Sequence, residues 1–330
     1  MQTTATTVMP NLPRSPAFTV NTGTPNTPAL IATSTGPGTA SLIRVFDYAT
    51  GGERFRIQPY ESTFVGGVRV AIGDVSGDGT DDIVTGIGPG GGPRIRVFSG
   101  KDGAVVKDFF AYEESFRGGL FVAVGDINGD GVQDILTGTE VGGGPRVSAF
   151  DGKTGAVLAN FFAFDVNQRG GVRVAAGDFD GDGKAEIVAT TGEGVATMVR
   201  VMNADGSVVR EFAPYTASFT GGVSLAVADV NGDGVPDIAT GAEAGGGPHV
   251  QLFDGKTGAT LSSFYAYDSG FTGGVRVALQ DVDGDGKADI VTGMGVGGSS
   301  EVRVLRGTDL QPLDRFFAFD DMFTGGVYVG

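Results

Sequence analysis

Short runs of β-branched and aromatic residues alternate with turns rich in Gly, Asp, Ser and Pro along most of this chain. In its first complete unit such runs occupy residues 68–72, 82–85, 94–98 and 105–112. Apolar runs of this length, bounded by turn-forming residues, are typical of β-strands. No segment shows a sustained apolar repeat of 3.6 residues, so the pattern predicts an all-β fold.

The four-strand pattern returns at a near-constant period. The stretch FVGGVRVAIGDVSGDGTDDIVTG recurs in recognisable form every 51 or 52 residues, with copies that start near residues 64, 116, 168, 219 and 271. Four strands in a unit of about 40–50 residues are typical of a β-propeller blade.

The two ends of the repeat region complement each other. Segments 29–34, 41–46 and 55–60 match the second, third and fourth strands of a unit, whereas the closing strand, within 323–330, matches only a first strand. Together they make a composite blade that leaves no sheet edge unpaired. We therefore predict a closed six-bladed β-propeller of four-stranded antiparallel blades. The alternative is that the sequence is an arbitrary truncation of a longer array of repeats.

This propeller is predicted over residues 28–330. Residues 1–27 are rich in Thr, Pro and Asn and are interpreted as a disordered linker without the basic and apolar regions of a signal peptide. The chain is therefore interpreted as a monomeric part of a larger polypeptide. A net charge of −16 argues against a nucleic-acid partner, and no apolar run is long enough to predict membrane insertion.

Every complete unit carries the motif D-x-[DNS]-G-D-G-x-x-[DE] between its first and second strands. Oxygen-bearing side chains at alternate positions, with a backbone carbonyl at position seven, suit a hard cation with six to eight ligands. Gly at position six permits the sharp turn that this requires. The candidate metal ligands are Asp74, Ser76, Asp78, Thr80 and Asp82; Asp126, Asn128, Asp130, Val132 and Asp134; Asp178, Asp180, Asp182, Lys184 and Glu186; Asp229, Asn231, Asp233, Val235 and Asp237; and Asp281, Asp283, Asp285, Lys287 and Asp289.

These candidate positions hold 17 of the 39 acidic residues of the chain, and such crowded carboxylates repel each other unless a cation lies among them. The looser coordination of Ca²⁺ favours it over Mg²⁺, for up to five ions. An EF-hand is excluded, because a strand follows each loop and position twelve is Thr or Ala instead of a bidentate Glu. Asp and Asn side chains that merely cap backbone turns remain the alternative.

The unit resembles the FG-GAP (VCBS-type) repeat of integrin α-subunit propellers and of many exported bacterial proteins. The matching pieces are Phe-x-Gly-Gly before the first strand, the Asp loop, Thr-Gly after the second strand, and Gly-Pro before an aliphatic-Phe strand. The resemblance implies calcium in the loops and a location outside the cytoplasm, at the cell surface or secreted. The third unit departs from it at Gln168, Glu186 and 192–197, and the longer Glu side chain puts that site in doubt.

Other conspicuous residues predict little chemistry. The Gly-Gly-Gly-Pro turns lack the helix and Lys-Ser/Thr of a phosphate-binding loop, and the lone His249 has no nucleophile motif beside it. Arg94, Arg146 and His249 occupy equivalent positions that could line one face for a ligand. Paired aromatic residues of the fourth strands are expected to pack between blades.

The preferred interpretation is a calcium-binding propeller that is not an enzyme. We expect an extracellular module for adhesion, binding or structure, in which the metal has a structural role and the ligand is a protein or a glycan. A calcium-dependent glycan-binding (lectin-like) module is the alternative. A polysaccharide-active enzyme is disfavoured, because the constant spacing leaves no room for cleft-forming insertions.

Overall fold

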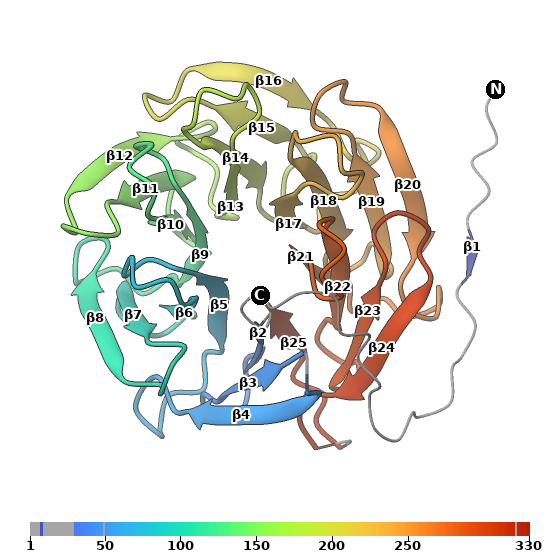
Figure 1. The fold of residues 1–330 in the computed structure, drawn as a ribbon, viewed down its shortest axis with the longest axis horizontal. Helices are drawn as coiled ribbons and strands as arrows, with labels where there is room; N and C mark the ends of the chain where they lie inside the picture. The colour runs from blue at the N-terminus through green and yellow to red at the C-terminus, as the bar shows by residue number, and fades with distance from the viewer. Residues whose placement is uncertain (1–6, 9–29, 49, 321) are drawn as a thin grey trace.

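The computed structural model has an all-β fold, with six sheets arranged around a central axis like the blades of a propeller (Figure 1). It describes residues 7–8, 30–48, 50–320 and 322–330. The predicted linker therefore lies outside the described residues, apart from β1 (Thr7–Val8), which pairs in parallel with β20. The described part of the chain contains no helix long and apolar enough to cross a membrane.

Blades 1 to 5 follow each other along the chain, and each is built from four antiparallel strands, to which β1 adds a short parallel strand at the edge of blade 4. Blade 1 contains β5 (Val68–Gly73), β6 (Asp82–Ile87), β7 (Arg94–Phe98) and β8 (Val105–Phe110). Blade 2 contains β9 (Leu120–Gly125), β10 (Asp134–Thr139), β11 (Arg146–Phe150) and β12 (Val157–Phe162). Blade 3 contains β13 (Val172–Gly177), β14 (Glu186–Thr191), β15 (Val199–Met202) and β16 (Val208–Phe212). Blade 4 contains β17 (Val223–Ala228), β18 (Asp237–Ala242), β19 (His249–Phe253) and β20 (Thr260–Tyr265), and blade 5 contains β21 (Val275–Gln280), β22 (Asp289–Met294), β23 (Glu301–Leu305) and β24 (Pro312–Phe317).

The sixth sheet, the closing blade, joins the two ends of the propeller as predicted. It orders β25 (Val327–Val329), β2 (Leu30–Thr35), β3 (Ile43–Asp47) and β4 (Gly52–Ile57). Strands β25 and β2 are antiparallel, and the amide of Ala32 donates to the carbonyl of Gly330 at 2.9 Å. The ring is thus closed by main-chain hydrogen bonds instead of a covalent link.

Most predicted strands lie within one or two residues of the observed ones. The exceptions lie in the closing blade: its fourth strand, predicted at 55–60, is found at Gly52–Ile57, and its closing strand, predicted over 323–330, is found at Val327–Val329. The amide of Gly51 donates to the carbonyl of Tyr48 at 3.3 Å, just before β4, and the pairing of β3 with β4 shifts in register between Val45 and Phe46.

Burial increases toward the middle strands of each blade. All six residues of β6 are buried, whereas β8 on the outer rim alternates between exposed and half-buried residues. The first strands of the blades surround the axis and the fourth strands form the circumference (Figure 1). This order explains why second strands read as continuous apolar runs and fourth strands tolerate charged residues.

The core is divided into six clusters of buried apolar side chains, one between each pair of neighbouring blades in the described part of the chain. The cluster between blades 1 and 2, for example, joins Ile95 and Val97 to Leu120 and Ile135. Each blade therefore depends on both neighbours for burial, as expected of a repeat fold.

The expectation for the aromatic residues holds only in part. Tyr112 is buried, with its hydroxyl 3.1 Å from the carbonyl oxygens of Thr137 and Arg146 in the next blade, and burial raises its pKa to about 12. Phe109 packs on Phe150 across the same interface. Phe110 instead is 47% exposed, because consecutive residues of a strand point to opposite faces.

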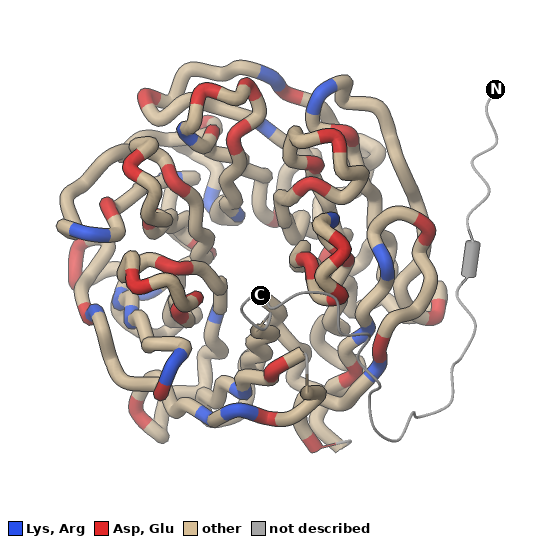
Figure 2. Tube along the Cα trace, viewed as in Figure 1, with Lys and Arg blue, Asp and Glu red and all other residues tan. Residues whose placement is uncertain are grey.

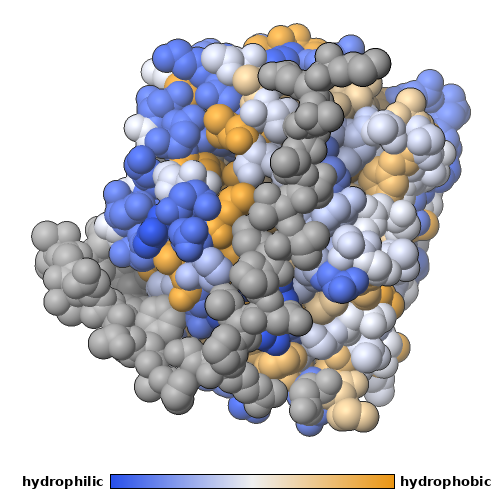
Figure 3. Space-filling view, turned by 90° about the vertical axis from the view of Figure 1, so that its right-hand side faces the viewer, coloured by the Kyte–Doolittle hydropathy of each residue, from blue (hydrophilic) through white to orange (hydrophobic). Residues whose placement is uncertain are grey.

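The outer surface carries scattered apolar side chains. In the side view of Figure 3 they lie among hydrophilic residues instead of forming one continuous patch on the visible face. Isolated exposed apolar residues are normal on soluble proteins, so they give no sign of a binding surface there.

Candidate metal centres

The five Asp loops connect the first and second strands of blades 1 to 5, as predicted. We number them 1 to 5, over residues 74–82, 126–134, 178–186, 229–237 and 281–289. Acidic residues accordingly recur around the ring (Figure 2). All 25 candidate ligands lie within these loops or at the first residue of the strand that follows.

The first Asp of each loop organises the turn. In loop 5, Oδ1 of Asp281 accepts hydrogen bonds from the amides of Gly284 and Asp285, at 2.8 and 3.1 Å, and Oδ2 accepts from Gly286 at 2.9 Å. The first Asp of the other four loops accepts the equivalent bonds from the glycines at positions four and six. The backbone capping that was the alternative to metal binding therefore exists, but a carboxylate oxygen retains a second lone pair for a cation.

The glycine at position six has the predicted role. Gly286 adopts a φ of +85°, a conformation that residues with a Cβ rarely take. No atom lies within 4 Å of where its Cβ would be, so the backbone conformation and not a lack of space requires glycine.

The last carboxylate of each loop begins the second strand and lies at the bottom of the loop. Asp289 is 1% exposed, and its oxygens accept hydrogen bonds from the amides of Val282 and Gly307, at 3.2 and 3.3 Å. Burial, followed by the nearby charge of Asp283, raises the pKa of Asp289 to about 7. Burial likewise raises the pKa of its counterparts Asp82, Asp134, Glu186 and Asp237. A buried carboxylate that resists ionisation is one that a cation would stabilise.

Carboxylates converge most closely in loops 3 and 5. Oxygens of Asp178, Asp180 and Glu186 lie within 4.8 Å of one another, as do those of Asp281, Asp283 and Asp285. Loop 3 was the site that the sequence put in doubt, yet its Glu186 reaches the cluster and accepts a hydrogen bond from the amide of Phe179. Both clusters can hold a metal ion.

In each loop one oxygen of the carboxylate at position five accepts a backbone hydrogen bond from position seven. Oδ1 of Asp285 accepts from the amide of Lys287 at 2.9 Å, and the other four loops repeat this bond. In loops 1 and 2 the second oxygen pairs with a lysine: Lys101 lies 2.8 Å from Asp78, and Lys153 lies 3.1 Å from Asp130. These lysines occupy an oxygen that a metal ion would take.

The turn between the third and fourth strands also contacts loops 1, 2, 4 and 5, a contribution that sequence reasoning missed. Asn128 of loop 2 donates to Asp151, and Asn231 of loop 4 donates to Asp254, at 3.0 and 3.4 Å. In loop 5 the equivalent turn residue is Arg306, 3.5 Å from the acidic Asp283. A turn Asp therefore accompanies Asn at position three in loops 2 and 4. Where position three is Asp, the equivalent turn residue is Arg306 in loop 5 and Asn203 in loop 3.

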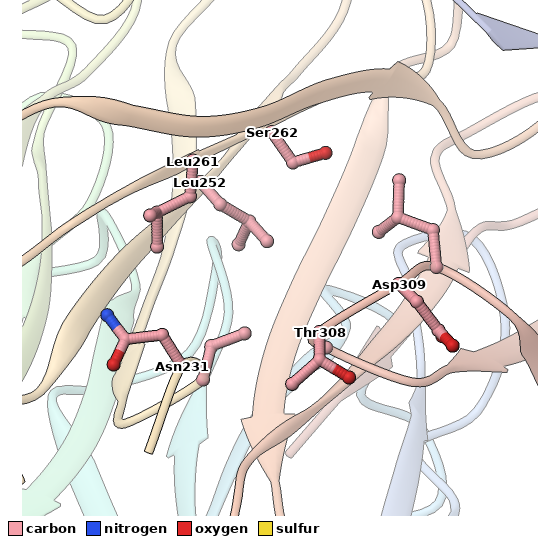
Figure 4. Close-up of a pocket in the computed structure, with 9 residues that line it drawn as sticks. Asn231, Leu252, Leu261, Ser262, Thr308 and Asp309 are labelled. Carbon is pink, nitrogen blue, oxygen red and sulfur yellow. The ribbon is translucent and has the colours of Figure 1, made fainter. Parts of the chain in front are cut away.

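A pocket of about 430 Å³ lies beside loop 4, between blades 4 and 5 (Figure 4). Leu252 and Leu261 give it an apolar wall, and Asn231, Thr308 and Asp309 place polar groups around it. Leu310, which also lines it, has a φ of +61°, where the turns of blades 1 to 4 have glycine. Strain of this kind is often retained at binding sites.

The residues expected to line one face are engaged with their own blades. Arg94 pairs with Asp108 at 2.6 Å, Arg146 donates to Asn160, and Nε2 of His249 lies 2.8 Å from the hydroxyl of Ser263. Burial lowers the pKa of His249. Their ligand-binding role stays a prediction.

The chain is similar to known repeat proteins. Residues 126–189 and 178–240 match the model of the FG-GAP-like repeat, and residues 221–261 match that of the FG-GAP repeat. Integrin alpha-V of Gallus gallus is 28% identical over 210 residues, which cover 53% of this chain and 20% of the integrin.

Among solved structures, a protein of unknown function from Bacteroides caccae aligns over 92% of this chain and 98% of its own, with a TM-score of 0.57 and 11% identity. That likeness supports the fold alone. The rhamnogalacturonan lyase YesW aligns over 89% of this chain and 64% of its own, with a TM-score of 0.44 and 16% identity.

Proposed function

The chain is a six-bladed β-propeller with FG-GAP repeats, and from this premise we propose that it is a calcium-stabilised, non-catalytic binding module of an extracellular or cell-surface protein. The observation that carries the proposal is the repetition of one oxygen-rich loop in five blades, each with a buried carboxylate at its base. The partial similarity to integrin alpha-V supports the location.

The donor set suits calcium. The side chains that face each other in the loops offer carboxylate, amide and hydroxyl oxygens, which hard cations prefer. In loop 1, Oδ1 of Asp82 is buried and has no hydrogen-bond partner, so a cation would satisfy it. A mixed set of carboxylate, amide, hydroxyl and backbone-carbonyl ligands suits the variable geometry of Ca²⁺ better than the strict octahedron of Mg²⁺.

The loops should differ in affinity. Loops 3 and 5 have four carboxylates each and already bring three of them together. In loops 1 and 2 a lysine must first leave the carboxylate at position five. We therefore propose that loops 3 and 5 bind calcium most tightly, because affinity rises with the charge of the ligands.

The variant Asp285→Asn tests this assignment. Its amide oxygen can keep the bond from the Lys287 amide, while an NH₂ group replaces the free oxygen, so the fold should persist with one tight calcium ion fewer. Native mass spectrometry and calorimetric titration would measure the stoichiometry and show affinity at that loop falling by about tenfold or more.

Asp283→Asn is the matched control, because loops 2 and 4 carry Asn at this position. It should retain the ion with a smaller loss of affinity than Asp285→Asn. Equal calcium binding by the wild-type protein and Asp285→Asn would contradict the assignment of loop 5.

The binding role requires its own test. Immobilised protein, saturated with calcium, should retain a component of extracellular matrix or cell-wall fractions, and the same column treated with chelator should release it. Retention of nothing from these fractions would count against a binding module, even if calcium were bound.

Glycan binding is a second candidate, which the pocket beside loop 4 favours. Its hydroxyl, amide and carboxylate groups suit a polar ligand of sugar size. A glycan array probed with and without calcium separates this candidate from protein binding.

A further inference from the structure

Six side chains form a ring around the propeller axis, at the second residue of each first strand or its equivalent in β25. We call this set the axial ring, and its members are Arg69, Phe121, Arg173, Ser224, Arg276 and Tyr328. Arginine thus alternates with an aromatic residue or Ser from blade to blade.

The arginines stack on the aromatic neighbours. The guanidinium of Arg69 lies 5.3 Å from the ring centre of Phe121 and 4.6 Å from that of Tyr328. Arg173 lies 4.6 Å from Phe121, and Arg276 lies 3.8 Å from Tyr328. These cation–π contacts link five of the six residues into one assembly.

Two of the three arginines have a carboxylate partner from the following blade. Nη2 of Arg69 donates to Glu140, and Nη2 of Arg173 donates to Glu243. Both glutamates directly follow a second strand, and both arginines are more than nine-tenths buried. In both pairs, therefore, a terminal guanidinium nitrogen of an axial-ring arginine binds a carboxylate.

The third arginine lacks this partner. The equivalent position in the closing blade is Gly36, where a Cβ would lie 2.0 Å from the carbonyl oxygen of Gly325, so no side chain fits there. Nη1 of Arg276 makes only long hydrogen bonds, at 3.3 and 3.5 Å, to the carbonyls of Met294 and Val327. Among the described residues Arg276 has no acidic partner, and its buried Nε, like those of Arg69 and Arg173, has no hydrogen-bond partner.

The charge of this assembly is unbalanced, with three guanidinium groups against two carboxylates. Arg276, Tyr328 and Ser224 are half-buried, whereas Arg69, Phe121 and Arg173 are buried. The unpaired cation is thus on the accessible side of the ring. We propose that Arg276 and its half-buried neighbours form a binding site for a carboxylate group of a ligand, which completes the pattern that Glu140 and Glu243 establish.

A carboxylate fits better than a dianion. One negative charge neutralises the ring, whereas a phosphate dianion would leave a negative excess in a partly desolvated place. Arginine binds a carboxylate through two parallel hydrogen bonds, and the Tyr328 ring behind it holds the guanidinium plane in place. The site involves no Asp-loop residue, so it does not rest on calcium binding.

Acetate is the simplest probe. In the calcium-equilibrated protein, the ¹H–¹⁵N signal of the Arg276 Nε–H should shift saturably as acetate replaces chloride at constant ionic strength. Arg276→Met keeps an apolar contact with Tyr328 and should weaken acetate binding about tenfold or more. Arg117→Met, which removes an exposed arginine just before β9, should bind acetate like the wild type.

A second variant acts in the opposite direction. Glu243→Gln keeps the size and the acceptor of the side chain but removes one internal negative charge, so acetate should bind severalfold more tightly. An unchanged affinity in both Arg276→Met and Glu243→Gln, or an equal response to acetate and chloride, would overturn the proposal. Glucuronate and N-acetylaspartate then distinguish a sugar acid from an acidic peptide side chain as the source of the carboxylate.

Discussion

Removal of calcium should lower the melting temperature of this protein by about 14–28 °C. A ligand at ten times its Kd stabilises the native state by about 1.4 kcal/mol, so five occupied loops would contribute about 7 kcal/mol. For a chain of this size each kcal/mol corresponds to a few degrees, about 2–4 °C. Differential scanning calorimetry of calcium-saturated and chelator-treated protein measures the difference.

The physical cause is repulsion between carboxylates within each loop. Without a cation, the buried Asp289 and its counterparts either stay protonated or bring an uncompensated charge into the base of the loop. Calcium added back should restore the melting temperature, and magnesium at the same concentration should restore less of it. Identical melting curves with and without chelator would refute a structural role for the metal.

Deletion of residues 327–330 should have the second large effect, because it opens the ring. Strand β25 covers the edge of β2, and Val327 and Val329 are 0% and 8% exposed within the cluster between blade 5 and the closing blade. Burial of two valines contributes about 3–6 kcal/mol, which approaches the whole net stability of many domains. Size-exclusion chromatography and calorimetry should therefore show aggregation or a much lower melting temperature.

A milder pair of variants keeps this prediction measurable if the deletion does not fold. Val327→Ala should lower the free energy of unfolding by about 2 kcal/mol, from lost burial and a small cavity. Val296→Ala, at a position that is 55% exposed, should change it by less than about 0.5 kcal/mol. If the deletion left the melting temperature unchanged, β25 would not be the strand that closes the ring.

Local spacing predicted much of this molecule. The pattern of apolar runs and turns predicts the strand positions, the repeat and the composite blade. This pattern is local, because each run or turn spans only a few residues. The same holds for the Asp loops, because their ligands lie within nine residues and Gly286 makes its turn by its own conformation. Hence all five loops could be located without a structure, including loop 3, which has Glu186 at its last position.

Contacts between residues far apart in the sequence could not be predicted in this way. Arg69 pairs with Glu140 of the next blade across 71 residues, and Asn128 pairs with Asp151 of its own blade across 23. Which of Phe109 and Phe110 faces the next blade likewise depends on the register and twist of the strand.

By itself, then, the sequence determined the class of fold, the number of blades and the oxygen-bearing residues of each loop, because all three depend on short segments that repeat along the chain. Only the tertiary structure decided which loops gather three carboxylates, which turn residues support them, and that Arg276 lacks the partner its two counterparts have. The first two features depend on how the side chains of a loop and a turn are arranged within one blade, and the third depends on which residues of neighbouring blades meet around the axis. None of them follows from local spacing alone.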